Sequence, residues 1–319
     1  MASNEKIDKI VGDAKQRLAK TEAQGLKLVQ KGFAELAESI PKPSDELIQW
    51  QAENTIRRQV GSFAEYVLQP VIENHVEAAI IEGYQTADEL LRQALTGTPL
   101  ENALIENAQG LSQQLRDDAL RKPLADLVNA MPEEAVKFFR QAAVLGTQVD
   151  FDKLYLNFAR LDRTLTFNTY RAAKQATYRA NNHVVQSWVW HSACDRRTCV
   201  VCWANHGSVH DLSEDMVSHS NCRCTCIPKT KTWKELGFNV PDELESSINV
   251  PLGEDLFESL DVGDKMVILG PSAYAEYEKG NVTLRDFVGY SRGSDDKVYP
   301  RRKSNRDLGI ERTRGKSES

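Results

Sequence analysis

Cysteine is absent from most of this sequence of 319 residues. All six cysteines lie between Cys194 and Cys226, together with three of the six histidines. A chain of this length with 41% hydrophobic residues can bury a core without disulfide bonds. In a reducing compartment, clustered cysteines are metal ligands more often than disulfide partners. The cluster therefore favours a metal site over a disulfide framework.

Long hydrophobic runs are absent as well. The sequence begins with MASNEKIDKI, which is polar where a secretory signal would be apolar. No stretch approaches the roughly 18 to 20 apolar residues that span a bilayer. These absences predict a cytoplasmic protein without a membrane partner.

Strand patterns are nearly absent before residue 183. Along residues 5–39, apolar residues recur at spacings of three and four between lysines and glutamates, which is typical of an amphipathic helix. Pro41 and Pro43 interrupt this pattern, and Ser44 or Asp45 is the expected N-cap of the next helix. Further helices are expected over 50–95, 100–131, 132–145 and 150–182. The pattern predicts a helical bundle or an arm of antiparallel helices.

The period of the apolar residues changes from 3.6 to 2 after Asn182. The segment HVVQSWVWHS alternates and is rich in β-branched and aromatic residues, which predicts a strand that leads into the cysteines. Beyond Pro228 the pattern is mixed. Gly270 and Pro271 predict the start of a helix, Gly280 its end, and Thr283 the cap of another.

Positive charge gathers near the C-terminus, although the whole chain has a net charge of −6. Residues 297–316 contain eight basic and two acidic residues, so that this segment carries +6 and the remainder −12. Such a segment is either a solvated, flexible terminus or a binding site for an anionic partner. The second interpretation predicts nucleic-acid contacts by Arg301, Arg302, Lys303 and Arg306.

The helix expected over 150–182 has two unlike faces. At 100° per residue, one sector holds the apolar residues Leu154, Phe158, Leu161, Leu165, Ala172 and Ala176. The opposite sector holds Arg160, Arg163, Arg171 and Lys174. The basic face is either a solvated surface or a contact surface for nucleic acid or for an acidic partner.

The cysteine cluster has the spacing of a zinc site. Cys199 and Cys202 form a C-x-x-C pair, and His219, Cys222 and Cys224 supply a second group of soft or borderline ligands. Zn²⁺ prefers four nitrogen or sulfur ligands in a tetrahedron. The preferred set is Cys199, Cys202, His219 and Cys222, with Cys224 as the rival for the last position.

The remaining members of the cluster fit that spacing less well. Cys194 and Cys226 are expected to be ordinary buried or partly exposed thiols. His206 and His210 are expected to be polar loop residues.

Catalytic alternatives find less support in the sequence. A zinc deaminase would need an H-x-E element followed by a P-C-x-x-C element, and the P-C-x-x-C element is absent. A thioredoxin-type C-x-x-C pair fits the spacing, but the additional ligands favour metal, and no single thiol stands out as a nucleophile. Glu276 and Glu278 match the E-x-E pair of arginine-directed ADP-ribosyltransferases, but Glu243 and Glu245 match it equally well. Both matches are treated as chance.

Two stretches, DRRTCVVCWANHG and HSNCRCTCIP, resemble the Mu F-like minor head proteins, also called phage head morphogenesis proteins. The residues that carry the resemblance are Trp190, Asp195, Arg197, Thr198, Cys199, Cys202, His206, Gly207, His219, Asn221, Cys222, Arg223, Cys224 and Pro228. The segment ILGPSAYAEYEKGNVTLRDFVG is similar to the family's C-terminal stretch, so the resemblance covers about Asp150 to Gly289. Cys194 and Cys226 depart from the family pattern.

This resemblance implies a virion component that is not an enzyme. Such proteins act in head morphogenesis and in DNA packaging or delivery, and the implied partners are the portal protein, a capsid or scaffold protein and packaged DNA. The implied locations are the head interior or portal vertex, and the host cytoplasm during assembly. The alternative is a zinc-dependent enzyme that acts on nucleic acid or nucleotides.

The sequence thus predicts an α+β protein with a predominantly helical N-terminal half, a small zinc-stapled module of strands and loops, and a mixed C-terminal segment. The predicted segments are an N-terminal helical arm (1–40), a helical domain (41–183), the zinc module (184–230), the C-terminal part of the Mu F-like domain (231–290) and a basic, flexible tail (291–319).

Overall fold

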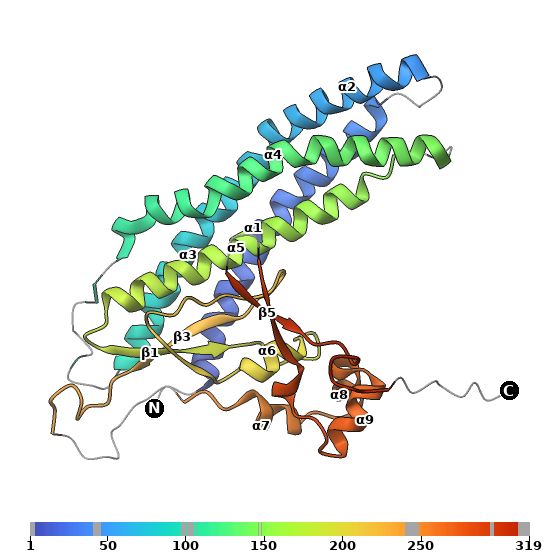
Figure 1. Cartoon of the computed structure of the whole chain (residues 1–319). Helices are drawn as coiled ribbons and strands as arrows, with labels where there is room; N and C mark the ends of the chain where they lie inside the picture. The colour runs from blue at the N-terminus through green and yellow to red at the C-terminus, as the bar shows by residue number, and fades with distance from the viewer. Residues whose placement is uncertain are drawn as a thin grey trace. The chain divides into compact units, whose positions relative to one another are not determined.

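The computed structural model describes residues 4–40, 46–96, 100, 105–106, 108–145, 147, 149–239, 249–293 and 297–311. Its long helices are α1 (Asn4–Ser39), α2 (Glu46–Phe63), α3 (Gln69–Leu95), α4 (Ser112–Leu145) and α5 (Asp152–Ala180) (Figure 1). Short helices and strands follow, in the order β1 (Val185–His191), α6 (Val200–Asn205), β2 (Val209–Asp211), β3 (Thr225–Thr230), α7 (Gly253–Glu258), α8 (Val262–Leu269), α9 (Pro271–Glu278), β4 (Val288–Arg292) and β5 (Val298–Arg302). The predicted α+β class with a helical N-terminal half is confirmed. Among the described helices, none is both long enough and apolar enough to cross a membrane.

The chain forms two compact units. The helical unit contains residues 11–86 and 107–173, and the sheet unit contains residues 1–10, 87–106 and 174–319. The helices α1, α3 and α5 each contribute to both units. The boundaries of these units therefore differ from those of the five segments predicted from the sequence.

The helical unit is built on the amphipathic faces that the sequence predicts. Ala14 and Leu18 of α1, Ala79 of α3, and Phe167 and Tyr170 of α5 form one buried cluster. Burial of such side chains stabilises the fold by about 1.5 to 3 kcal/mol for each large one. The apolar stripe of α1 thus covers α3 and α5.

Ion pairs between exposed arginines and buried glutamates join these helices. Arg17 of α1 donates to the carboxylate of Glu82 of α3, with Nε 2.9 Å from Oε2. Arg140 of α4 donates to Glu53 of α2, with Nε 2.7 Å from Oε1. Because Glu82 is only 7% exposed, the loss of Arg17 would leave a buried carboxylate without the cation that binds it, whereas Glu53, which is 8% exposed, would keep Arg57 at 3.8 Å.

A close helix contact surrounds His75 of α3. Its Nδ1 lies 2.9 Å from both carboxylate oxygens of Asp162 in α5, and both side chains are buried. A Cβ atom at Gly25 of α1 would lie 2.4 Å from Nε2 of His75. Gly25 is therefore required for α1 to approach α3 this closely.

Two helix predictions need correction or lie outside the described residues. The predicted boundary at Pro132 is wrong, because α4 continues through Pro123 and Pro132. The buried residues of α4 continue on both sides of Pro132, from Met131 to Ala135 and beyond, and this packing outweighs the lost backbone hydrogen bond. The predicted cap at residues 44–45 lies outside the described residues.

The predicted basic face of α5 is wrong at two of its four positions. Arg171 is 2% exposed and Lys174 is fully buried, whereas Arg160 is exposed. Arg163 is partly buried and pairs with Glu22 of α1. The 100° spacing shows which residues share a face of a helix, but not whether other parts of the chain cover that face. Because Arg171 and Lys174 are buried, the basic face of α5 is not a continuous solvent-exposed stripe.

The sheet unit contains a three-stranded antiparallel sheet of order β2-β1-β3. The predicted alternating strand is β1, and Trp188 pairs with His210 of β2 and with Pro228 of β3. From the side of α5, Lys174 donates to the hydroxyl of Thr225 over 3.0 Å. The hydroxyl of Tyr178 donates to the carbonyl of Cys226 over 3.2 Å, so that the end of α5 holds β3 in place.

The C-terminal part confirms the predicted turns. Gly270 has φ +83° and caps α9, which begins at Pro271, and Gly280 has φ +73° after its last turn. Thr283 forms a capping box with Asp286 at the start of a short 3₁₀ helix, Leu284–Phe287.

The predicted flexible tail is wrong for residues 297–311. The strand β5 pairs with β4, and Ile310 belongs to the buried cluster that includes Phe287. The guanidinium of Arg302 donates to the carbonyls of Ile268 and Leu269 at the end of α8. Apolar and capping contacts, which charge alone does not reveal, order this basic segment.

Candidate metal centre

The C-x-x-C pair lies at the start of α6. Cys199 has extended backbone angles and caps the helix, and the amides of Cys202 and Trp203 donate to its carbonyl over 2.9 and 3.0 Å. One helical turn therefore brings both sulfur atoms to the same side. Val200, Val201 and Trp203 of α6 are buried in a separate apolar cluster, and this packing holds the helix in place.

A hydrogen-bonded turn fixes the approach to this pair. The carboxylate of Asp195 accepts from the amide of Arg197 over 2.9 Å and from the hydroxyl of Thr198 over 3.0 Å. The same hydroxyl accepts from the amide of Asp195 over 3.2 Å. The D-x-R-T element of the sequence is thus a turn that positions Cys199.

The second group of ligands lies on a tight turn before β3. Asn221 adopts φ +61°, in the left-handed region that asparagine tolerates, and the amide of Cys222 donates to the carbonyl of His219 over 3.2 Å. Nδ1 of His219 lies 2.8 Å from the carbonyl oxygen of Ser220. Donation from Nδ1 to this carbonyl leaves Nε2 as the ligand atom.

The two groups converge. Nε2 of His219 lies 3.1 Å from the sulfur of Cys199 and 3.1 Å from that of Cys202. The sulfurs of Cys202 and Cys222 are 3.6 Å apart, close to the roughly 3.8 Å between two thiolates that share one tetrahedral zinc.

Two overlapping triads could hold a metal ion. One consists of Cys199, Cys202 and His219, and the other of Cys202, Cys222 and Cys224, so Cys202 belongs to both. In each triad the ligand atoms lie within 4.8 Å of one another. The structure therefore brings together all five residues that the sequence singles out, and all six cysteines are thiols.

The crowding of these groups changes their acidity. Contact with Cys202, assisted by His219, lowers the pKa of Cys199 to about 5, although burial opposes the change. Contact with the sulfurs of Cys199 and Cys222 raises the pKa of His219 to about 11. Contacts with the sulfurs of Cys199, Cys222 and Cys224 raise the pKa of Cys202 well above its usual value. The lowered pKa of Cys199 favours its thiolate, which is the form that binds a cation, and such a cation would compete with the proton of His219.

Ser192 is a neighbour of the centre that the sequence does not reveal. Its hydroxyl donates to the carbonyl of Cys202 over 2.8 Å and lies 3.1 Å from the sulfur of Cys224. Contact with Cys202 lowers the pKa of Cys224, but Cys222 and burial outweigh it and raise that pKa to about 12. No sequence pattern distinguishes Ser192 from other serines, so only the fold identifies it.

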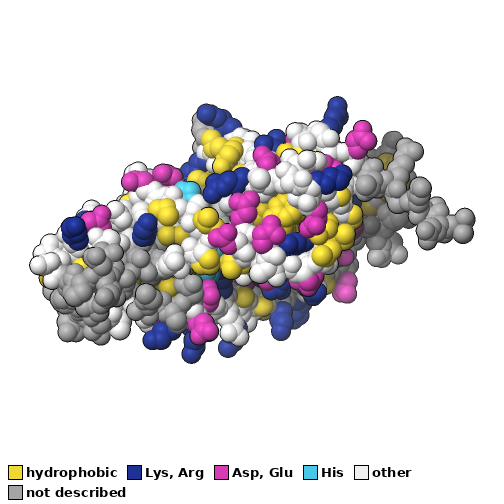
Figure 2. Space-filling view, turned by 90° about the horizontal axis from the view of Figure 1, so that it is seen from below, with side chains coloured by type: hydrophobic (Ala, Val, Ile, Leu, Met, Phe, Trp, Pro, Cys, Tyr) yellow, Lys and Arg dark blue, Asp and Glu magenta, His cyan; other side chains and the backbone are white. Residues whose placement is uncertain are grey.

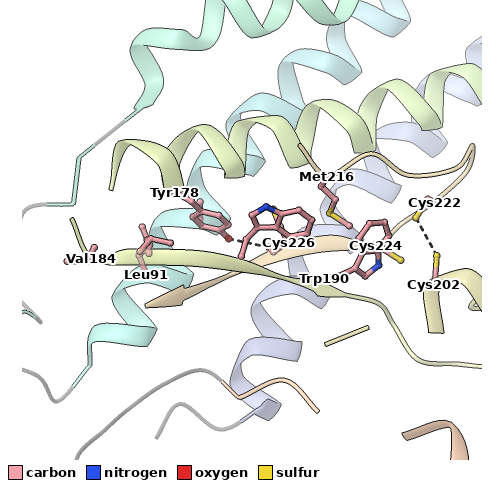
Figure 3. Close-up of a cluster of buried hydrophobic side chains, with 12 residues drawn as sticks. Leu91, Tyr178, Val184, Trp190, Cys202, Met216, Cys222, Cys224 and Cys226 are labelled. Carbon is pink, nitrogen blue, oxygen red and sulfur yellow. Dashed lines mark hydrogen bonds between the residues drawn. The ribbon is translucent and has the colours of Figure 1, made fainter. Parts of the chain in front are cut away.

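The sheet beneath the ligands is apolar. Figure 3 shows Tyr178, Trp190, Met216 and Cys226 in the same buried cluster as Cys202, Cys222 and Cys224. Cys226 is fully buried in β3, while Cys194 is partly exposed and packs against the other cluster of the sheet unit. Both agree with the expectation of ordinary thiols.

His206 and His210 are expected to be polar loop residues rather than ligands, and neither belongs to a metal-binding triad. The loop assignment is wrong for His210, which lies in β2, while His206 lies in a buried turn. His206 is 5% exposed, and its Nδ1 accepts from the amide of Ser192 over 2.9 Å. His210 lies in β2 and stacks on Trp188, with the rings 4.2 Å apart and 12° from parallel. Gly207, with φ +81°, has no room for a Cβ atom, which would lie 2.5 Å from the carbonyl oxygen of Pro251. The H-G element is therefore part of the packing around the centre.

The other predicted site residues are dispersed. Glu276 of α9 binds Lys279 and Asn281, each over 2.7 Å, whereas Glu243 and Glu245 lie outside the described residues. Arg301, Arg302 and Arg306 are exposed, and Lys303 is partly buried.

Comparison of the chain with models of protein families, with characterised proteins and with solved structures found no match.

Proposed function

We propose that this chain is a minor head protein of a tailed phage, in which a structural zinc ion holds the fold of the sheet unit. It acts at the portal vertex and in the procapsid interior during head morphogenesis, and takes part in packaging or delivery of DNA. The observation that carries the proposal is the convergence of the Cys and His side chains of the D-x-R-T-C-x-x-C and H-x-N-C-R-C elements. Other residues of these elements support the same arrangement: Asp195 forms the turn before Cys199, and Asn221 adopts the left-handed conformation before Cys222.

Zinc is the ion that suits this donor set. Thiolates and one imidazole are the ligands of structural zinc sites, while carboxylates and carbonyls suit magnesium and calcium. The ligands come from α6 and from the turn before β3, so the ion would tie these two segments together.

The ligands we propose are Cys199, Cys202, His219 and Cys222. A hydroxyl has one proton, and Ser192 donates its proton to the carbonyl of Cys202. The oxygen of Ser192 can then accept a hydrogen bond from the thiol of Cys224, so we place Cys224 outside the metal shell. We therefore expect Cys224→Ser to retain the metal and Cys222→Ser to lose it, as measured by metal content. The opposite pattern would assign the fourth position to Cys224.

Four protein ligands leave no coordination site on the metal for a reacting water. In the proposed role the protein is therefore a structural component of the particle and not an enzyme. The alternative, a zinc-dependent enzyme that acts on nucleic acid or nucleotides, needs an open metal position. Contact with DNA stays a prediction for the exposed residues Arg160, Arg301, Arg302 and Arg306 and for Lys303, and it is no longer predicted for the buried Arg171 and Lys174.

The decisive experiment is deletion of the gene in the phage or prophage that encodes it. We expect the protein in low copy in purified procapsids, bound to the portal protein, and we expect particles without it to be non-infectious. Glu278→Gln should rescue the deletion as well as the unchanged gene does. Normal infectivity of the deletion mutant would contradict the proposal. A Glu278→Gln protein that folds and enters particles but does not rescue would favour the enzyme.

A further inference from the structure

The helix α8 of the sheet unit has its apolar side toward solvent. At 100° per residue, Val262, Gly263, Met266 and Val267 fall within a sector of about 140°. Val262 is 54% exposed, Met266 39% and Val267 69%. No charged residue of α8 lies in this sector, although a solvated helix face is normally polar. We call these four residues the α8 face.

The one basic residue of α8 points the other way. Lys265 is 7% exposed, and its Nζ lies 3.0 Å from the carboxylate of Glu258. Ile268 and Leu269 are buried on the same side. The inward side of α8 thus contains Lys265 and the buried apolar residues. Packing within the fold explains why those apolar residues are there, but it does not explain the apolar residues on the outward side.

The border of the α8 face is acidic. Asp264 lies next to the face on the helix, and Asp261 caps the start of the helix, with Oδ1 2.8 Å from the amide of Asp264. Glu258 pairs with Lys265 on the inward side, and Arg302 donates to the carbonyls of Ile268 and Leu269 at the end of α8. The negative charge beside the α8 face is therefore that of Asp261 and Asp264, at the start of the helix. Figure 2 shows hydrophobic side chains interleaved with acidic and basic ones on the face seen from below.

Gly263 gives the α8 face a hollow. A Cβ atom at this position would meet only the side-chain oxygen of Asp261 within 4 Å, at 3.1 Å. Met266 and Val267 lie three and four residues later, so they stand beside the missing side chain on the same face. A small residue surrounded by larger apolar ones is the kind of surface into which a side chain of another helix inserts.

From these observations we propose that the α8 face is a docking site for a basic amphipathic helix of a partner protein. The apolar stripe of that helix would cover Val262, Met266 and Val267, with one side chain over Gly263. Its lysines or arginines would face Asp261 and Asp264. Exposed apolar surface with a polar border marks interaction sites, and charge complementarity selects the sign of the partner. The inference does not depend on the proposed function or on the metal.

The test uses the full-length protein and a fluorescein-labelled synthetic helix of about 18 residues with leucines on one side and lysines on the other. Fluorescence anisotropy should show saturable binding at physiological salt, and a matched peptide with glutamates in place of the lysines should bind at least about tenfold more weakly. Val267→Lys should weaken binding of the basic peptide by about tenfold or more, because it places a charge in the apolar stripe.

The matched control is Tyr290→Lys, which adds the same charge at a 63% exposed apolar residue of β4. It should leave binding unchanged, and both variants should keep the melting temperature of the unchanged protein. Equal effects of the two variants, or equal binding of the acidic peptide, would overturn the proposal. Sedimentation that shows a dimer lost in Val267→Lys would overturn it as well, since the occupant would then be a second copy of this chain.

Discussion

Replacement of Cys202 by serine is the most informative perturbation of the metal centre. Cys202 is 3% exposed and is the one residue that both triads share, so its loss leaves neither triad complete. Structural zinc supplies folding free energy on the order of 10 kcal/mol in small modules, and whole domains are stable by only about 5 to 15 kcal/mol. We therefore expect Cys202→Ser to unfold the sheet unit or to lower its melting temperature severely.

Cys226→Ser is the matched control, since Cys226 is equally buried and lies in the same apolar cluster. It should cost about 1 to 3 kcal/mol for the buried hydroxyl and should retain the metal. Tryptophan fluorescence reports mainly on the sheet unit, because four of the five tryptophans belong to it (Trp188, Trp190, Trp203 and Trp233) and only Trp50 belongs to the helical unit. The melting temperatures of both variants are measured by tryptophan fluorescence, with and without chelator. If Cys202→Ser melted like Cys226→Ser, and chelator affected neither, the reasoning would be refuted.

Two further predictions concern the helical unit. Gly25→Ala should destabilise the protein by about 1 to 3 kcal/mol, because its Cβ atom would overlap the buried ring of His75. Gly12→Ala on the same helix has open space and should stabilise by up to about 1 kcal/mol, and urea denaturation that ranks the two in the reverse order would contradict the packing. The hydrogen bond from Arg140 lowers the pKa of Glu53, so this pair stabilises the fold above the unfolded pKa of about 4.3, and the contribution is lost as pH falls through the lower folded value. Glu53→Gln should therefore cost about 1 kcal/mol at pH 7 and progressively less below pH 4, whereas a cost independent of pH would show that the charge of Glu53 is not involved.

The periodic patterns of the sequence predict the elements well, and they fail where contacts distant in sequence decide the outcome. The 3.6-residue pattern of α1 and the alternation of β1 need only local information, and so do the glycine and proline signals around α9. By contrast, Pro132 lies inside a helix because the buried stripe of α4 continues past it. Lys174 is buried because β3, fifty residues later, supplies the hydroxyl of Thr225.

The same distinction holds at the metal centre. Cys and His spacing predicts the residues that converge there because each pair is local: one helical turn joins Cys199 to Cys202, and one left-handed residue joins His219 to Cys222. Ser192 and His206 have no such local pattern, and their roles depend on β1 and α6 meeting in space. The basic C-terminal segment is predicted to be flexible from its charge alone. Its order depends on the burial of Ile310 and on the hydrogen bonds of Arg302, which the charge pattern does not predict.

The measurement that tests the central claim most directly is the metal content of the unchanged, full-length protein, combined with X-ray absorption at the metal edge. We expect about one zinc ion per chain, with three sulfur ligands near 2.3 Å and one nitrogen ligand near 2.0 Å. A protein that folds and melts identically after complete removal of metal, or a zinc ion with an oxygen ligand from water, would contradict a closed structural site.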